Sequence, residues 1–179
     1  GYDPGRARSQ AYRLPVHRNW YKATTSHNTV IVDRASQEGV TGHPELFLTN
    51  DEVSAAAAYV DEAYENVVHH RLIVLRPDYL LTADILDTSD GNDHTFDWTY
   101  HNLGESITSA QATEVAAPDT GQGFEYVEDC RRGATEGDIA SEICNGENQT
   151  NVMVVGSGAS EVMIGTGPGE SVMDRVPTI

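Results

Sequence analysis

The chain has 179 residues, of which 28 are Asp or Glu and only 11 are Lys or Arg, so its formal net charge is −17 at pH 7. Nucleic acids and anionic membrane surfaces need a basic footprint on their partner, and this charge argues against both. Hydrophobic residues make up 39% of the chain and charged residues 22%, with sixteen glycines, which favours a loop-rich globular protein. No apolar run approaches the roughly 20 residues that span a bilayer.

The length suits one ordinary domain, so we expect residues 1–179 to form a single domain. Because the chain starts without Met and residues 162–179 still alternate toward apolar residues up to the last one, we expect it to be a fragment of a longer protein. The N-terminus has no signal-peptide pattern, so we expect any signal to lie upstream of Gly1. Its two cysteines, Cys130 and Cys144, have a spacing that a disulfide could span, but two cysteines alone establish little. No Cys-based zinc motif is present.

Short β-branched and aromatic runs separated by Gly-, Asp- and Ser-rich breaks predict antiparallel strands in a sandwich or barrel. The clearest pair flanks a turn at Arg76-Pro77-Asp78, where Pro and Asp favour a hairpin. In chain order the expected strands cover residues 29–33, 67–75, 79–86, 95–100, 106–115, 124–127, 151–155 and 161–164.

Two segments are ambiguous or misleading. Residues 52–64 contain Ala55 to Ala58, which favours a helix, but the surrounding β-branched and aromatic residues leave a strand equally open. Residues 87–94 are rich in Asp and resemble a calcium loop, yet they lack the EF-hand spacing. A solvated hairpin turn is the better interpretation of the second segment.

The most informative stretch runs from Arg18 to Asp33, immediately before and into the first expected strand. It holds two aromatic residues, Trp20 and Tyr21, followed by His27 and Asn28. A sugar site needs an aromatic platform for the apolar face of the ring and polar groups that converge on hydroxyls and carboxylates. This stretch offers both kinds of group within eleven residues.

The residues Tyr2-Asp3-Pro4-Gly5, Arg18-Asn19-Trp20-Tyr21 and Ser26-His27-Asn28-Thr29-Val30-Ile31-Val32-Asp33 together resemble the C-terminal β region of heparinase II/III-like polysaccharide lyases. In that family an Asp-Pro-Gly turn leads to a His-Asn-Thr-Val motif. Weaker likeness continues through residues 70–75, 79–84, 94–104 and 165–169. Arg34 stands where the family pattern leads us to expect Gly.

The resemblance implies an all-β antiparallel sandwich, supersandwich-like, that packs against an upstream helical α/α-toroid domain absent from this sequence. It also implies β-elimination on a uronic-acid polysaccharide such as alginate or a glycosaminoglycan, with the helical domain supplying a Tyr and a His. The sandwich contributes one His to the cleft, and His27 matches it. We therefore expect His27 to be catalytic, with Asn28, Arg18, Trp20, Tyr21 and His101 as candidate substrate-binding residues.

Several relatives hold a structural zinc ion in the sandwich, so the resemblance also implies a metal site. The candidate ligands are His43, with His27 as its alternative, Glu45 and His70. Neutral imidazole and carboxylate suit zinc. Adjacent residues of a strand point to opposite faces, so at most one of His69 and His70 faces such a site. An ordinary core or surface role for these imidazoles is the competing interpretation.

The expected reaction places the protein in the periplasm or outside the cell, with an acidic polysaccharide and its own helical domain as partners. Two other functions stay open. One is a noncatalytic carbohydrate-binding or structural β-sandwich, and the other is a metal-holding β-domain of a different enzyme class. A serine hydrolase is disfavoured because no Gly-x-Ser-x-Gly motif is present.

Overall fold

The structure, a computed structural model, describes residues 1–5, 12–156, 158–171 and 173–179. Every strand pairing within these residues is antiparallel, and the helical elements are single turns, which confirms the predicted all-β antiparallel class. Among the described residues, no helix has the length and apolar character needed to cross a membrane.

The chain divides into two compact units, where the sequence led us to expect one domain. The first unit comprises residues 1–36 and 96–179, and the second comprises residues 37–95. The second unit is therefore an insertion between β1 and β6, two strands of the first unit that pair with each other.

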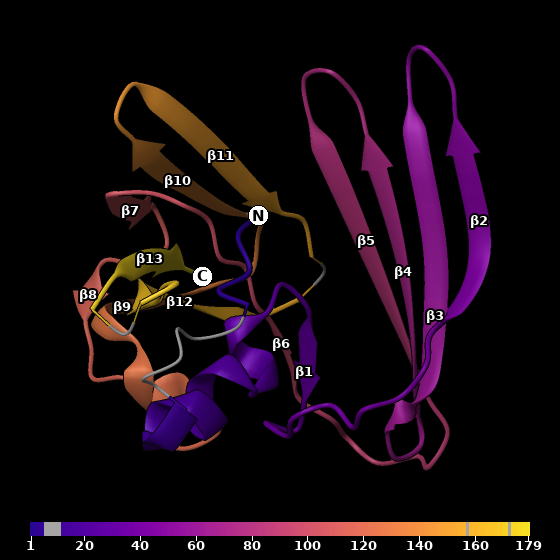
Figure 1. The fold of residues 1–179 in the computed structure, drawn as a ribbon, viewed down its shortest axis with the longest axis horizontal. Coiled ribbons are helices and arrows are strands. Elements are labelled where there is room, and N and C mark those ends of the chain that lie inside the picture. The colour runs from indigo at the N-terminus through magenta and orange to yellow at the C-terminus, as the bar shows by residue number, and fades with distance from the viewer. Residues whose placement is uncertain (6–11, 157, 172) are drawn as a thin grey trace. The chain divides into compact units, whose positions relative to one another are not determined.

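The second unit is a four-stranded sheet in the order β2-β3-β4-β5, drawn as the purple and magenta arrows in Figure 1. Its strands are β2 (His43–Thr49), β3 (Ser54–Tyr64), β4 (Val67–Leu75) and β5 (Leu80–Thr88). The predicted β4–β5 hairpin is confirmed, with Arg76 donating its N–H to the Tyr79 carbonyl across the turn at 2.9 Å. The alanine-rich segment is strand β3 because it pairs on both sides, with β2 and with β4, and tertiary pairing outweighs helix propensity.

The first unit contains three smaller sheets, in the orders β1-β6, β11-β10-β7 and β13-β12-β9-β8. Their strands are β1 (Val30–Val32), β6 (Phe96–Trp98), β7 (Ser106–Ser109), β8 (Glu114–Val115), β9 (Glu128–Thr135), β10 (Ile139–Asn145), β11 (Asn148–Val154), β12 (Ser160–Pro168) and β13 (Arg175–Thr178). Three short turns, η2 (His17–Tyr21), η3 (Thr24–Ser26) and η4 (Phe124–Tyr126), join them.

The core of the first unit joins the N-terminal segment to the later strands. Trp20 and Tyr21 from η2 pack with Val127 and Cys130. A second cluster is built from Ala112, Val162 and Ile164. Met163 of β12 packs against the first cluster, so β12 helps to bury η2, although the two elements are far apart in the sequence.

Two sequence expectations about this unit are wrong, and the possible disulfide is not formed. Residues 124–127 form a helical turn rather than a strand, because Gly123 enters it at φ +97° and the chain turns back on itself. The expected strand 106–115 is interrupted and forms two strands, β7 and β8. Cys130 and Cys144 are both free, since they lie on β9 and β10 in different sheets.

Gly167 on β12 is required because the ring of Trp20 fills the space beside it. A Cβ atom built on Gly167 would lie 2.5 Å from the Trp20 ring. We expect Gly167→Ala to displace the ring and lower the free energy of unfolding by about 1–3 kcal/mol, as measured by urea denaturation followed by circular dichroism. Gly156→Ala is the matched control, because nothing lies within 4 Å of its Cβ position. Equal stabilities for the two variants would contradict this role for Gly167.

Candidate functional site

His27 stands at the end of the η3 turn, where its backbone N–H bonds to the Thr24 carbonyl at 3.0 Å. Its side chain is 35% exposed and its Nδ1 atom lies 2.6 Å from Oδ2 of Asp3. A carboxylate can only accept, so Nδ1 carries the proton and donates it to Asp3. Within the described residues Nε2 has no hydrogen-bond partner. In its neutral form the ring therefore carries an unshared electron pair at Nε2.

Asn28 holds the N-terminal segment beside His27. Its Nδ2 donates to the Tyr2 carbonyl at 3.1 Å, and its Oδ1 accepts the backbone N–H of His101 at 2.6 Å. The Tyr2 N–H in turn donates to the His101 carbonyl at 2.6 Å. These bonds place Asp3 against His27, so the structure gives Asn28 a positioning role.

His101 is buried completely, and its placement corrects the expectation that it contacts substrate. Its Nε2 donates to the Thr25 carbonyl at 2.8 Å, so Nδ1 of the neutral ring accepts from the Thr178 hydroxyl at 3.0 Å. Burial lowers the pKa of His101 to about 4, against a smaller opposing contribution from the Thr25 carbonyl. The ring is therefore neutral at pH 7 and joins η3 to β13.

The two aromatic residues expected to form a sugar platform lie in the core instead. Trp20 has no exposed surface, and its Nε1 donates to the Pro168 carbonyl at 3.0 Å. The Tyr21 hydroxyl donates to the Gly169 carbonyl at 2.8 Å, and only 4% of this residue is exposed. Arg18 lies on the same turn and is exposed. The sequence cannot distinguish aromatic residues of the core from aromatic residues that bind a sugar, because Trp and Tyr serve both purposes.

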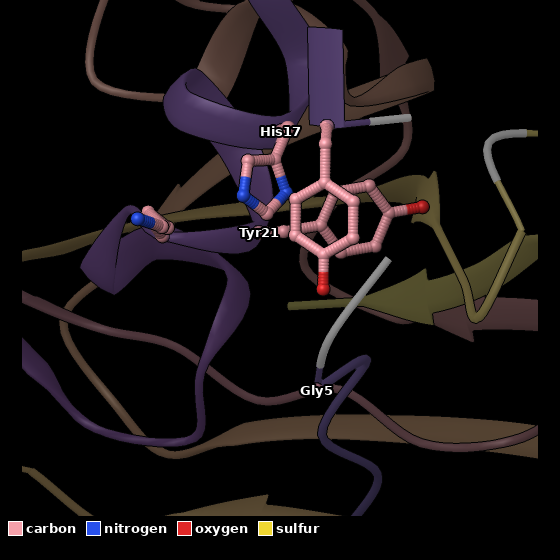
Figure 2. A pocket seen from close by; sticks show the side chains of 5 residues that line it. Gly5, His17 and Tyr21 are labelled. Carbon is pink, nitrogen blue, oxygen red and sulfur yellow. The ribbon is translucent and has the colours of Figure 1, made fainter. Parts of the chain in front are cut away.

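A pocket of about 260 Å³ opens on the first unit beside η2 (Figure 2). Gly5, Tyr12, His17, Tyr21 and Lys22 line it. Figure 2 shows the side chains of His17 and Tyr21 directed toward the same space, with Gly5 on a separate segment beside it. Of these residues the sequence analysis singled out only Tyr21 as a site residue.

The expected metal ligands lie near one another on the second unit but do not converge. His70 Nδ1 lies 3.3 Å from Glu45 Oε2, whereas His43 Nε2 lies 3.6 Å from Asp61. The Tyr59 ring stands between the two imidazoles, with its centroid 4.8 Å from that of His43 and 5.3 Å from that of His70. Among the described residues no group of three His, Cys, Asp or Glu side chains has the geometry to hold a metal ion. The arrangement therefore does not fit a zinc site.

The other face of that sheet carries a polar cluster that the sequence analysis did not identify. Asp84 on β5 accepts hydrogen bonds from His69 Nε2 at 2.7 Å and from Arg71 Nε at 2.6 Å. Burial alone would raise the pKa of the Asp84 carboxyl, but these two donors outweigh it and hold the pKa below its usual value. His69 and Arg71 are two positions apart on β4, so their side chains lie on the same face of the sheet, opposite to His70.

His101 makes stability depend on pH between about 6.5 and 4. In this window the unfolded chain protonates the imidazole and the folded chain does not, so the free energy of unfolding falls as the pH is lowered. For a shift from 6.5 to about 4 the loss is about 3 kcal/mol. We expect His101→Gln to be less stable than wild type at pH 7 and to lose this contribution to the slope. Urea denaturation at pH 7, 5.5 and 4.5 measures it, and parallel pH profiles for the two proteins would refute the buried neutral state.

The fold and the His27 region can now be compared with known proteins. The family described as heparinase II/III-like, C-terminal, matches residues 2–165, so this all-β chain belongs to the heparinase II/III-like C-terminal family. A solved structure described as a heparinase III gene product matches over 98% of this chain at 16% sequence identity, with a TM-score of 0.53. The matched region is 27% of that protein's chain. No curated protein matches the sequence.

Proposed function

We propose that the chain is the C-terminal β region of a polysaccharide lyase that cleaves a uronic-acid polysaccharide by β-elimination, with His27 in the cleft. The observation that carries the proposal is the Asp3–His27 pair, which leaves a basic imidazole nitrogen at Nε2 in a member of the heparinase II/III-like family. The matched heparinase III is a further reason to place the activity in this class.

β-Elimination makes defined chemical demands on the site. A base takes the C5 proton of the uronate, the C4–O bond to the leaving sugar breaks, a double bond forms between C4 and C5, and the leaving oxygen receives a proton. The substrate carboxylate must be neutralised while charge accumulates beside it. Nε2 of neutral His27 can accept a proton, and the protonated ring can donate one or pair with the carboxylate.

Asp3 suits this role because it holds the imidazole in one tautomer. An ionised carboxylate at Nδ1 keeps Nε2 as the basic nitrogen and stabilises the ring once a second proton arrives. In this proposal His27 is the catalytic residue and Asp3 is a positioning residue. Arg18, which is exposed on η2, remains a candidate for substrate binding.

The remaining proton-transfer groups belong to the upstream helical toroid domain that we propose as partner of this region in the same protein. The chain spans about a quarter of the length of the matched heparinase III, which leaves room for such a domain. A polymeric acidic substrate agrees with a periplasmic or secreted location, which we include in the proposal.

In the protein with its upstream sequence, we expect His27→Ala to lower kcat by about 10²–10⁴ because one proton-handling group is lost. The melting temperature should stay near that of wild type, since the His27 side chain is partly exposed and its side-chain partner, Asp3, is exposed as well. The measurement is the rise in ultraviolet absorbance of the conjugated uronate product on a panel of alginate, heparan-type and related acidic polysaccharides.

His94→Ala is the matched imidazole control, because His94 bonds to Asp90 within the Asp-rich turn of the second unit. It should keep wild-type turnover. Normal turnover by His27→Ala would overturn the catalytic assignment. A folded wild-type protein that binds a glycan saturably and never yields unsaturated product would instead support the alternative, a noncatalytic carbohydrate-binding domain.

A further inference from the structure

The pocket beside η2 combines the groups that bind a sugar ring. Tyr12 is 41% exposed, so part of its ring is accessible to a ligand. Its ring packs edge-on against His17, with centroids 4.5 Å apart and planes at 64°. This contact fixes the orientation of the Tyr12 ring, and an ordered aromatic face loses little entropy when a sugar packs on it.

His17 lines this pocket and supports the Tyr12 ring. Its Nδ1 is buried and has no hydrogen-bond partner among the described residues. Because Nδ1 has no accessible surface, a ligand in the pocket does not reach it, and His17 contributes to the pocket through its contact with Tyr12.

Lys22 supplies the positive charge of the pocket, and it is the single lysine of the chain. Four arginines, Arg34, Arg71, Arg132 and Arg175, are paired with carboxylates. Among the described cations, Arg13, Arg18 and Lys22 form no ion pair and fall within ten residues of one another. Arg76 and Arg131 also form no ion pair among the described residues, so of the unpaired cations it is Lys22 that lines the pocket.

The pocket is joined to His27 through Asp3. Oδ1 of Asp3 accepts the backbone N–H of Gly5 at 2.7 Å, while Oδ2 contacts His27 at 2.6 Å. Gly5 adopts φ +58°, which favours glycine, and it lines the pocket. The turn that orients the catalytic imidazole is thus also one wall of the pocket.

We propose that this pocket is a subsite for one uronate ring of the polysaccharide. Tyr12, held by its contact with His17, packs on the apolar face of the ring, and Lys22 pairs with the ring carboxylate. A volume of about 260 Å³ suits one small ring rather than a long segment of polymer. The proposal rests on the proposed function, because it takes the ligand class from the lyase reaction.

The single lysine provides the test. Reductive methylation of the 179-residue chain with ¹³C-formaldehyde labels two amines, Lys22 and the Gly1 terminus, and keeps both charges; Lys22→Arg assigns the two signals. Titration with methyl β-glucuronoside should shift the Lys22 signal saturably, while methyl β-glucoside and acetate should shift it far less. The proposal would be overturned if the glucoside or acetate shifted the Lys22 signal as much as the glucuronoside does.

Two variants test the contacts by saturation-transfer NMR of the sugar. Tyr12→Ala should weaken binding about threefold to tenfold, whereas Tyr79→Ala, an exposed tyrosine of the second unit, should bind as wild type. Lys22→Gln should lose about fivefold in glucuronoside affinity and none for the glucoside. If Tyr12→Ala binds the sugar as tightly as wild type, the proposed aromatic contact is refuted, and the subsite with it.

The outcome separates this proposal from the lyase assignment. Product formation by the longer protein with no saturable Lys22 shift would remove the subsite and leave the reaction intact. A saturable, carboxylate-dependent Lys22 shift in a protein that forms no unsaturated product would support the subsite and refute the lyase. The two readouts use different residues, so neither failure conceals the other.

Discussion

The first unit depends on side chains near the N-terminus that bond to backbone atoms near the C-terminus. Trp20 and Tyr21 donate to the carbonyls of Pro168 and Gly169, positions 148 residues away in each case. His101 adds a buried bridge between Thr25 and Thr178. Because each donor is buried, leaving one unpaired costs about 1–3 kcal/mol, so the segment has one favourable position.

This constraint places the candidate site. The η2 and η3 turns run between the buried anchors, and His17, Lys22 and His27 are carried on them or at their ends. Asn28 then holds Tyr2, which brings Asp3 to His27. The exposed pair Asp3 and His27 thus rests on buried hydrogen bonds made by other residues, an arrangement that holds the geometry of a site closely.

The parts that sequence predicted well are those that local patterns determine. The β4–β5 hairpin follows from two β-branched runs around a Pro-Asp turn, and its strands agree with the prediction to within two residues. The failures involve distant partners. Nothing local distinguishes a buried Trp20 from one exposed for a sugar, and its burial depends on the missing side chain of Gly167. Likewise, η4 follows Gly123, whose left-handed backbone turns the chain, and the strand pattern of residues 124–127 gives no sign of this turn.

The site shows the same division. His27 was found from the His-Asn-Thr motif, but its partner Asp3 is 24 residues earlier and only the fold brings the two together. The expected metal ligands failed for a related reason: the register of β2, β3 and β4 puts the Tyr59 ring between His43 and His70. Proximity of like residue types does not make a metal site unless their ligand atoms converge.

The charge of the chain raises a last question, because an acidic protein is proposed to bind an acidic polymer. At physiological ionic strength the Debye length is about 8 Å, so carboxylates elsewhere on the surface are largely screened at the pocket. Their effect is greatest on the approach of the polymer, which long-range repulsion slows. Affinity depends instead on the charges within a few ångströms, where Lys22 stands at the pocket and Asp3 is paired with His27. An overall charge of −17 is therefore compatible with an acidic ligand, provided that a cation such as Lys22 stands where the ligand binds.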